Sequence, residues 1–290
     1  MASVKNHDYQ ILPPSIWPFA TATALFTTLF SAAHWFESMR ANATLSPEAG
    51  RTYMIIGFVA FATAIFCLYS WWSAVSREAN EGEHTPVVQI GVRYSFILFI
   101  TSEVMVFATF FWAFFKYALH PMAVDGTFPL NYGVWPPAGV ETLSPWHLPL
   151  VNTILLLSSG AAATWAHHAI VHGDRKKTAI GLAIAIGLGW IFTLCQAYEY
   201  YEIVHTEAFS FSGNVYGAVF FMATGLHGAH VLIGSIFLLV CLIRILRGAM
   251  SAKQHVGFEM AAWYWHFVDV VWLFLFVAVY IWGAGGVSAH

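Results

Sequence analysis

The residues best suited to chemistry in this sequence are histidines and carboxylates that lie inside long apolar segments. The segment WYWHFVDVVWLFLF, residues 263–276, carries His266 and Asp269 three positions apart, and an earlier segment carries His227 and His230 at the same spacing. Side chains at this spacing lie on one face of a helix. Two such histidines could bind a metal ion, with Asp269 orienting one of them. Alternatively, the two faces could satisfy each other by hydrogen bonds away from lipid.

The second interpretation is the favoured one. A membrane cytochrome with two haems needs histidine pairs across two helices at two depths, whereas only His227 and His230 are central in the sequence of their segments. The two segments are joined by a short loop and are expected to pack as antiparallel neighbours. We therefore expect no metal site and no catalytic residue, but a structural polar cluster on the two facing helices. Its members are His227, His230, Glu259, His266 and Asp269.

Two further carboxylates lie in apolar segments. Glu103 has no Lys or Arg on its stretch of helix, and its neighbours are mostly phenylalanines. Desolvation without a cationic partner disfavours the charged form, so we expect Glu103 to be a largely protonated buried carboxyl. Such a group could donate a hydrogen bond, relay a proton or contact a lipid. Glu199, in QAYEYYE, is expected to reach the membrane interface at the end of its segment.

Composition identifies the kind of protein that must position these groups. The 290 residues are 59% hydrophobic and 9% charged, whereas soluble domains carry about 25% charged residues. The chain is therefore an integral membrane protein, and its net charge of −3 gives no basic surface for nucleic acid. A spanning helix needs about 20 apolar residues. Seven segments qualify: 16–36, 53–75, 94–119, 148–171, 178–201, 215–243 and 261–284.

The distribution of basic residues predicts the orientation of these segments. Of the 12 Lys and Arg, all but Arg40, Arg51 and Lys116 fall on one side of the membrane, which places the N-terminus inside and the C-terminus outside. A retinal protein would need a lysine within a segment, and the last lysine, Lys253, lies in a loop. Aromatic and basic residues at the inner ends of the segments suit anionic phospholipid headgroups. They include Trp72, Arg77, Arg93 and Arg244.

Five long motifs resemble subunit III of cytochrome c oxidase, in the haem-copper oxidase superfamily. In chain order they are FILFITSEVMVFATFFWAF (96–114), TWAHHAIVHGDRK (164–176), QAYEYYE (196–202), MATGLHGAHVLIGS (222–235) and FEMAAWYWHFVDVVWLFLF (258–276). The N-terminal stretch VKNHDYQILPPSIWP is similar to bacterial aa3-type members. This resemblance implies a bacterial plasma membrane location, with the mitochondrial inner membrane as the alternative.

The resemblance also implies an architecture. It is an all-α fold of seven transmembrane helices in two bundles, of two and five helices, that form a V-shaped cleft filled with phospholipid. The corresponding divisions are 1–75, a cytoplasmic linker at 76–92, and 93–290. Glu103 matches the family's buried carboxylate, which reacts with hydrophobic carbodiimides. The family's lipid-binding positions match Trp72, Arg77, Glu78, His84, Arg93, Phe99 and Arg244.

The function implied by the resemblance is that of a non-redox accessory subunit of a proton-pumping oxidase. Family members bind no haem or copper, and haem a and copper belong to partner subunits. The expected partners are catalytic subunit I and subunit II. The implied roles are to steady subunit I against loss of activity during turnover, and to aid proton uptake and oxygen access. Glu83 lies where mitochondrial relatives have a histidine, which changes the set of proton-collecting groups. The alternative function is a standalone membrane transporter or proton channel, which would need a continuous polar path.

Overall fold

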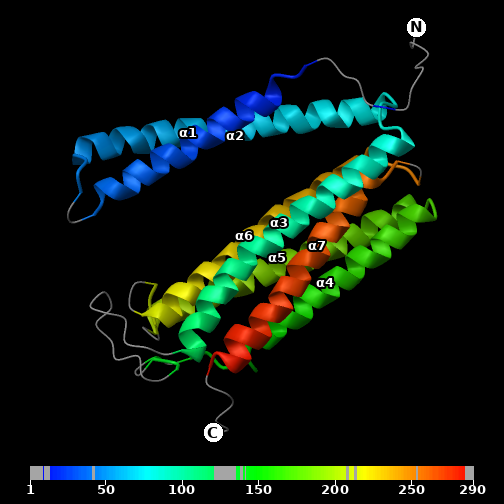
Figure 1. Ribbon diagram of the computed structural model, residues 1–290. Coiled ribbons are helices and arrows are strands. Elements are labelled where there is room, and N and C mark those ends of the chain that lie inside the picture. The colour runs from blue at the N-terminus through cyan, green and yellow to red at the C-terminus, as the bar shows by residue number, and fades with distance from the viewer. Residues whose placement is uncertain are drawn as a thin grey trace. The chain divides into compact units, whose positions relative to one another are not determined.

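The computed structural model describes most of the chain, and its helices account for most of the described residues (Figure 1). The described residues are 9, 14–40, 43–120, 135–137, 140, 142–206, 209–211, 214–252 and 254–284. Within these ranges there are seven α-helices and no strand element. The helices are α1 (Trp17–Ser38), α2 (Pro47–Asn80), α3 (Pro86–Leu119), α4 (Leu148–Val171), α5 (Arg175–His205), α6 (Val215–Leu246) and α7 (Val256–Leu275). A π-helix, η1 (Phe276–Trp282), continues α7.

The predicted helices are confirmed, but several extend beyond the predicted segments. Helices α2 and α3 begin at Pro47 and Pro86, because proline at the first helical position lacks only an N–H that would have no intrahelical partner. The predicted linker at 76–92 is therefore mostly helical, and only residues 81–85 separate α2 from α3. Helices α2 to α6, and α7 together with η1, are long and apolar enough to cross a membrane.

Helix α1 does not belong to that group of six among the described residues. It has 22 residues and contains four threonines. Three of the hydroxyls donate to the backbone carbonyl four positions earlier: Thr23 to Phe19 at 2.9 Å, Thr27 to Thr23 at 2.9 Å, and Thr28 to Ala24 at 2.8 Å. The threonines therefore lower the mean hydropathy of α1, although these three hydroxyls are hydrogen-bonded to backbone carbonyls of the same helix.

The chain divides into two compact units, residues 1–91 and 92–290. In the first unit, α1 and α2 pack along each other through small side chains, with Ala24, Ser31, Ala60 and Ala64 buried. Small residues allow helices to approach closely in a membrane, where apolar side chains gain little by leaving lipid.

In the second unit, four helices form a closed ring in which α4 contacts α5, α5 contacts α6, α6 contacts α7 and α7 contacts α4. Trp265 of α7 is fully buried at the centre of this ring. Its indole lies against Gly189 of α5 and Gly234 of α6, where even one added carbon would come within 3 Å of the ring. The glycines are thus what allows the large side chain to fill the space between three helices.

Helix α3 joins this ring in a different way, through a row of phenylalanines. Only 6% of its most apolar stretch is buried, compared with 61% for α7 and η1. Aromatic contacts connect Phe99 to Tyr264, with ring centroids 6.4 Å apart, and Phe107 to Phe267 at 5.9 Å. Nearer the other end of α3, Phe111 lies 4.4 Å from Phe274. Long side chains therefore connect α3 to α7, without the close backbone approach seen in the ring.

Candidate functional site: intramembrane polar contacts of the second unit

The polar residues expected to form one cluster on α6 and α7 instead make four separate groups of contacts. His230 turns to α3, Glu259 also contacts α3, and His266 with Asp269 contacts α4. His227 alone makes the expected contact between α6 and α7. For His227 and His230 the cause is geometric: positions three apart on a helix differ by about 60° in direction, which here points one at α7 and the other at α3.

Glu103 is not isolated, because His230 of α6 is its partner. Glu103 Oε2 lies 2.9 Å from His230 Nε2, and His230 Nδ1 lies 2.8 Å from the carbonyl of Leu226. A carbonyl only accepts, so Nδ1 carries a proton. Nε2 then either accepts from a protonated Glu103 or, when protonated, donates to the carboxylate. In both arrangements the pair is neutral overall and shares one proton between the two side chains.

His227 is buried and contacts the backbone of α7. Its Nε2 donates to the carbonyl of Val268 at 3.1 Å, and its ring packs against Phe192 and Trp272. Its Nδ1 is buried and has no hydrogen-bond partner within the described residues. The tautomer that donates to Val268 leaves this nitrogen as an unprotonated acceptor. His227 is thus a buried donor that connects α6 to the backbone of α7.

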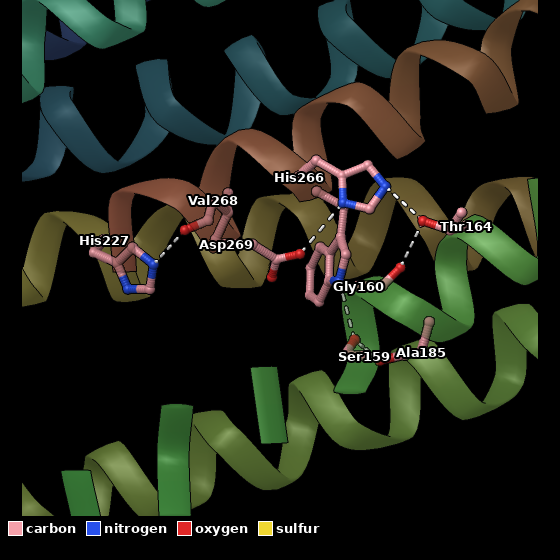
Figure 2. A network of polar contacts seen from close by, with 9 residues as sticks. Ser159, Gly160, Thr164, Ala185, His227, His266, Val268 and Asp269 are labelled. Carbon is pink, nitrogen blue, oxygen red and sulfur yellow. Dashed lines mark hydrogen bonds and ion pairs between the residues drawn. The ribbon is translucent and has the colours of Figure 1, made fainter. Parts of the chain in front are cut away.

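His266 links α7 to α4 (Figure 2). Its Nδ1 lies 3.4 Å from Asp269 Oδ2, and its Nε2 lies 3.0 Å from the hydroxyl of Thr164. The Thr164 hydroxyl also lies 3.1 Å from the carbonyl of Gly160, to which it can donate. If it donates there, Nε2 donates to Thr164; if instead the ring is neutral and Nδ1 donates to the carboxylate, the Thr164 proton is shared between Gly160 and Nε2. Alongside this group, Trp265 donates to Ser159 at 3.0 Å, and Ser159 donates to the carbonyl of Ala185 on α5 at 2.7 Å.

Glu259 pairs with Arg93 of α3 and not with another member of the expected cluster. It lies in the first turn of α7 and accepts from Arg93 Nε and Nη2, with a shortest distance of 2.8 Å. This two-point contact is the geometry in which guanidinium and carboxylate bind best. Arg93, expected to bind lipid, is therefore also part of a contact between α3 and α7.

The other expected lipid-binding residues are distributed over both units. Trp72 is 64% exposed, Arg77 lies in the last turn of α2, and Glu78 and His84 also belong to the first unit. In the second unit, Phe99 is 45% exposed and Arg244 lies in the last turn of α6. Each position suits an interface or a lipid-facing surface, and their role in lipid binding stays a prediction.

The sequence analysis missed one buried pair. Glu199 does not reach an interface: it is 2% exposed and accepts a hydrogen bond from the hydroxyl of Tyr280 at 2.6 Å. Tyr280 lies in the π-helix, a local change of helical period that no feature of the sequence indicated. In contrast, Thr164 could have been proposed from the sequence as a partner of a buried polar group, because it is a polar residue within an apolar segment. In the described part of the chain, no three His, Cys, Asp or Glu side chains lie close enough to hold a metal ion.

These features define a class of protein: a polytopic helical membrane protein whose intramembrane ionisable groups pair with one another or with the backbone. The family model described as cytochrome c oxidase subunit III matches residues 7–284. Similar proteins include cytochrome c oxidase subunit 3 of Triticum aestivum, 46% identical over 98% of this chain and 99% of the relative. The subunit 3 of Felis catus is 47% identical over 97% of this chain and 99% of the relative.

The chain belongs to the cytochrome c oxidase subunit III family, as the sequence motifs predicted. It is therefore a multi-pass membrane protein and a subunit of an oxidase complex.

Proposed function

We propose that this chain is the non-redox accessory subunit of a proton-pumping cytochrome c oxidase, in which haem a and copper belong to the partner subunits I and II. The observation that carries the proposal is the pairing inside the membrane-spanning segments. Glu103, His227, His230 and His266 each contact another side chain or a backbone carbonyl of this chain, which is what an architectural role requires. They connect α3, α4, α6 and α7 across separate contacts, whereas a standalone transporter or channel would need a continuous polar path.

The proposed setting is the bacterial plasma membrane, with the mitochondrial inner membrane as the alternative. The similarity of the N-terminal stretch to bacterial members supports it. We also propose seven spans in two bundles, of two and five helices, with phospholipid in the cleft, the N-terminus inside and the C-terminus outside. The excess of basic residues on one side supports this orientation.

The proposed lipid role rests on residues at the ends and surfaces of the helices. Glu259 occupies the Nε and Nη2 edge of Arg93, which leaves Nη1 for a phosphate oxygen. Phe99, about two turns further along α3 and 45% exposed, offers an apolar surface for an acyl chain. Arg93→Gln should therefore lower the phospholipid retained by the purified complex, measured by mass spectrometry. Arg40→Gln, at the predicted opposite membrane surface, is the control and should leave the lipid content unchanged.

The experiment that tests the function is gentle purification of the tagged chain. We expect haem a absorbance in the preparation, and we expect oxidase stripped of this chain to lose activity faster during turnover than the intact complex. A colourless homo-oligomer would favour the transporter. Stoichiometric iron or copper in the isolated, partner-free chain would contradict the non-redox assignment.

A further inference from the structure

We propose that the exposed side of α7, which we call the α7 strip, binds a transmembrane helix of another oxidase subunit. That helix places a hydrogen-bond donor against the Thr164 hydroxyl, beside His266. The strip consists of His266, Val270, Leu273, Phe274 and Val277. This inference rests on the proposed function and adds to it the surface through which the subunit binds a partner.

The strip is a continuous surface on an otherwise buried helix. His266, Val270, Leu273 and Val277 follow one another at three or four positions, which places them on one side of α7, and Phe274 lies next to Leu273. Val270 is 65% exposed and Val277 is 55% exposed, while the neighbouring Val268 and Trp272 are completely buried. The contact of Phe274 with Phe111 marks its edge toward α3, and the contact of His266 with Thr164 marks its edge toward α4. Figure 1 shows α7 between these two helices.

The depth of the polar part of the strip excludes water and lipid headgroups as its usual surroundings. Along the helix axis, at 1.5 Å per residue, His266 lies about 15 Å from Val256 and about 24 Å from Trp282. A helix of this length extends a few ångströms beyond each side of a hydrocarbon core about 30 Å thick. His266 is therefore about 10 Å inside the core. An imidazole lacks the long aliphatic stem that lets Lys or Arg reach the interface from such a depth.

The exposure of these polar groups is what requires a protein neighbour. The side chain of His266 is 43% exposed on this chain, and Thr164 is also exposed. Polar groups in membrane helices normally face other protein or a water-filled cavity. The ring of His266 is held at both nitrogens, and the Thr164 hydroxyl oxygen keeps a lone pair that can accept. Acyl chains provide no donor, whereas a helix with a hydroxyl, amide or indole N–H does.

The partner is a different subunit because this chain is one component of an oxidase complex. Apolar residues on both sides of the polar pair fit a helix that continues along α7. The polar pair at a single depth would fix the register of that helix, as hydrogen bonds between membrane helices commonly do.

Photo-crosslinking in the assembled oxidase tests this assignment. The probe is p-benzoylphenylalanine, introduced at Val270 and activated in native membranes before the haem-containing complex is purified. We expect a covalent adduct with another oxidase subunit, identified by mass spectrometry. Adducts with phospholipid only, with a second copy of this chain, or with residues 1–91 of the same chain would each overturn the inference. If haem co-purifies in such a case, the proposed function stands and the docking surface alone fails.

A second measurement separates docking from folding. Val270→Trp adds bulk to an exposed position, so the isolated chain should keep its melting temperature in detergent. In the complex, the added bulk should reduce the amount of chain retained with haem roughly tenfold. Leu194→Trp, on α5 and 67% exposed, is the matched control and should reduce it less. Unchanged retention of the Val270→Trp chain would show that the strip faces lipid and would overturn the inference.

Discussion

Helices α3 and α7 belong to the same unit and are both strongly apolar, but they are held in opposite ways. Helix α7 is buried over most of its length, and its Trp265 lies directly against the backbone at Gly189 and Gly234. Helix α3 has few buried residues, and phenylalanines with two polar contacts connect it to α6 and α7.

The difference shows that the two helices depend on different properties of their side chains. The position of α7 is fixed by volume, because a large ring fills the space that two glycines leave open. The position of α3 is fixed by a few polar atoms at the ends of long side chains, His230 with Glu103 and Glu259 with Arg93. A change of volume should therefore disturb α7 most, and a change of polarity should disturb α3 most.

The largest effect is expected at Trp265. Trp265→Ala removes a fully buried ring and the indole N–H that donates to the Ser159 hydroxyl. The free energy of unfolding should therefore fall by about 3–5 kcal/mol. Trp112→Ala, on α3 and 76% exposed, should change it by less than about 0.5 kcal/mol. Denaturant titration in mixed micelles measures both. Equal losses in the two variants would contradict the contrast between the helices.

A smaller effect is expected where α3 meets α6. Glu103→Leu and His230→Leu each leave a polar partner unsatisfied, which should cost about 1–3 kcal/mol of unfolding free energy. The double variant should cost less than the sum, with a coupling energy of about 0.6–1.7 kcal/mol, typical of hydrogen bonds between membrane helices. The same titration applied to all four proteins gives the coupling. Strict additivity would mean that the two side chains do not stabilise each other.

Much of this architecture could be predicted from the sequence, because the length of an apolar segment and the position of a proline are local properties. The helices and the starts of α2 and α3 follow from them. Glu103 was also found as an unusual carboxyl. Its partner was not, because the sequence does not fix the rotation of a helix about its axis. His227 and His230 share a face by spacing, but one reaches the backbone of α7 and the other reaches α3.

The pair formed by Glu199 and Tyr280 was unpredictable for a related reason. The π-helix at Phe276–Trp282 changes the rotation per residue, so positions counted at the α-helical period no longer give the correct face. Glu259 also shows that the sequence does not predict which residue a side chain pairs with. Its place in the first turn of α7 could be predicted, but its pairing with Arg93 depends on where α3 packs.

The smallest effect is expected at the turn between α4 and α5, where polar contacts are exposed to water. Asp174 caps α5 by accepting from the backbone N–H of Lys177 at 3.0 Å, and the Lys177 ammonium also lies 3.0 Å away. The backbone hydrogen bond is the main cause that lowers the pKa of Asp174 below 3.8. A carboxyl whose pKa is lowered by folding contributes stability above its unfolded pKa and loses it as the pH falls through the folded pKa.

Asp174→Ala should therefore lower the melting temperature slightly at neutral pH, and the difference from the parent should shrink as the pH falls below 3.8 and through the folded pKa. Asp174→Asn keeps a side-chain acceptor for the cap but loses the charge, so its deficit at neutral pH should be smaller. Thermal unfolding followed by circular dichroism across this pH range measures both variants. A deficit for Asp174→Ala that does not change with pH would show that the carboxylate charge contributes nothing. A deficit as large as that of His230→Leu would remove the distinction between water-exposed and intramembrane polar contacts.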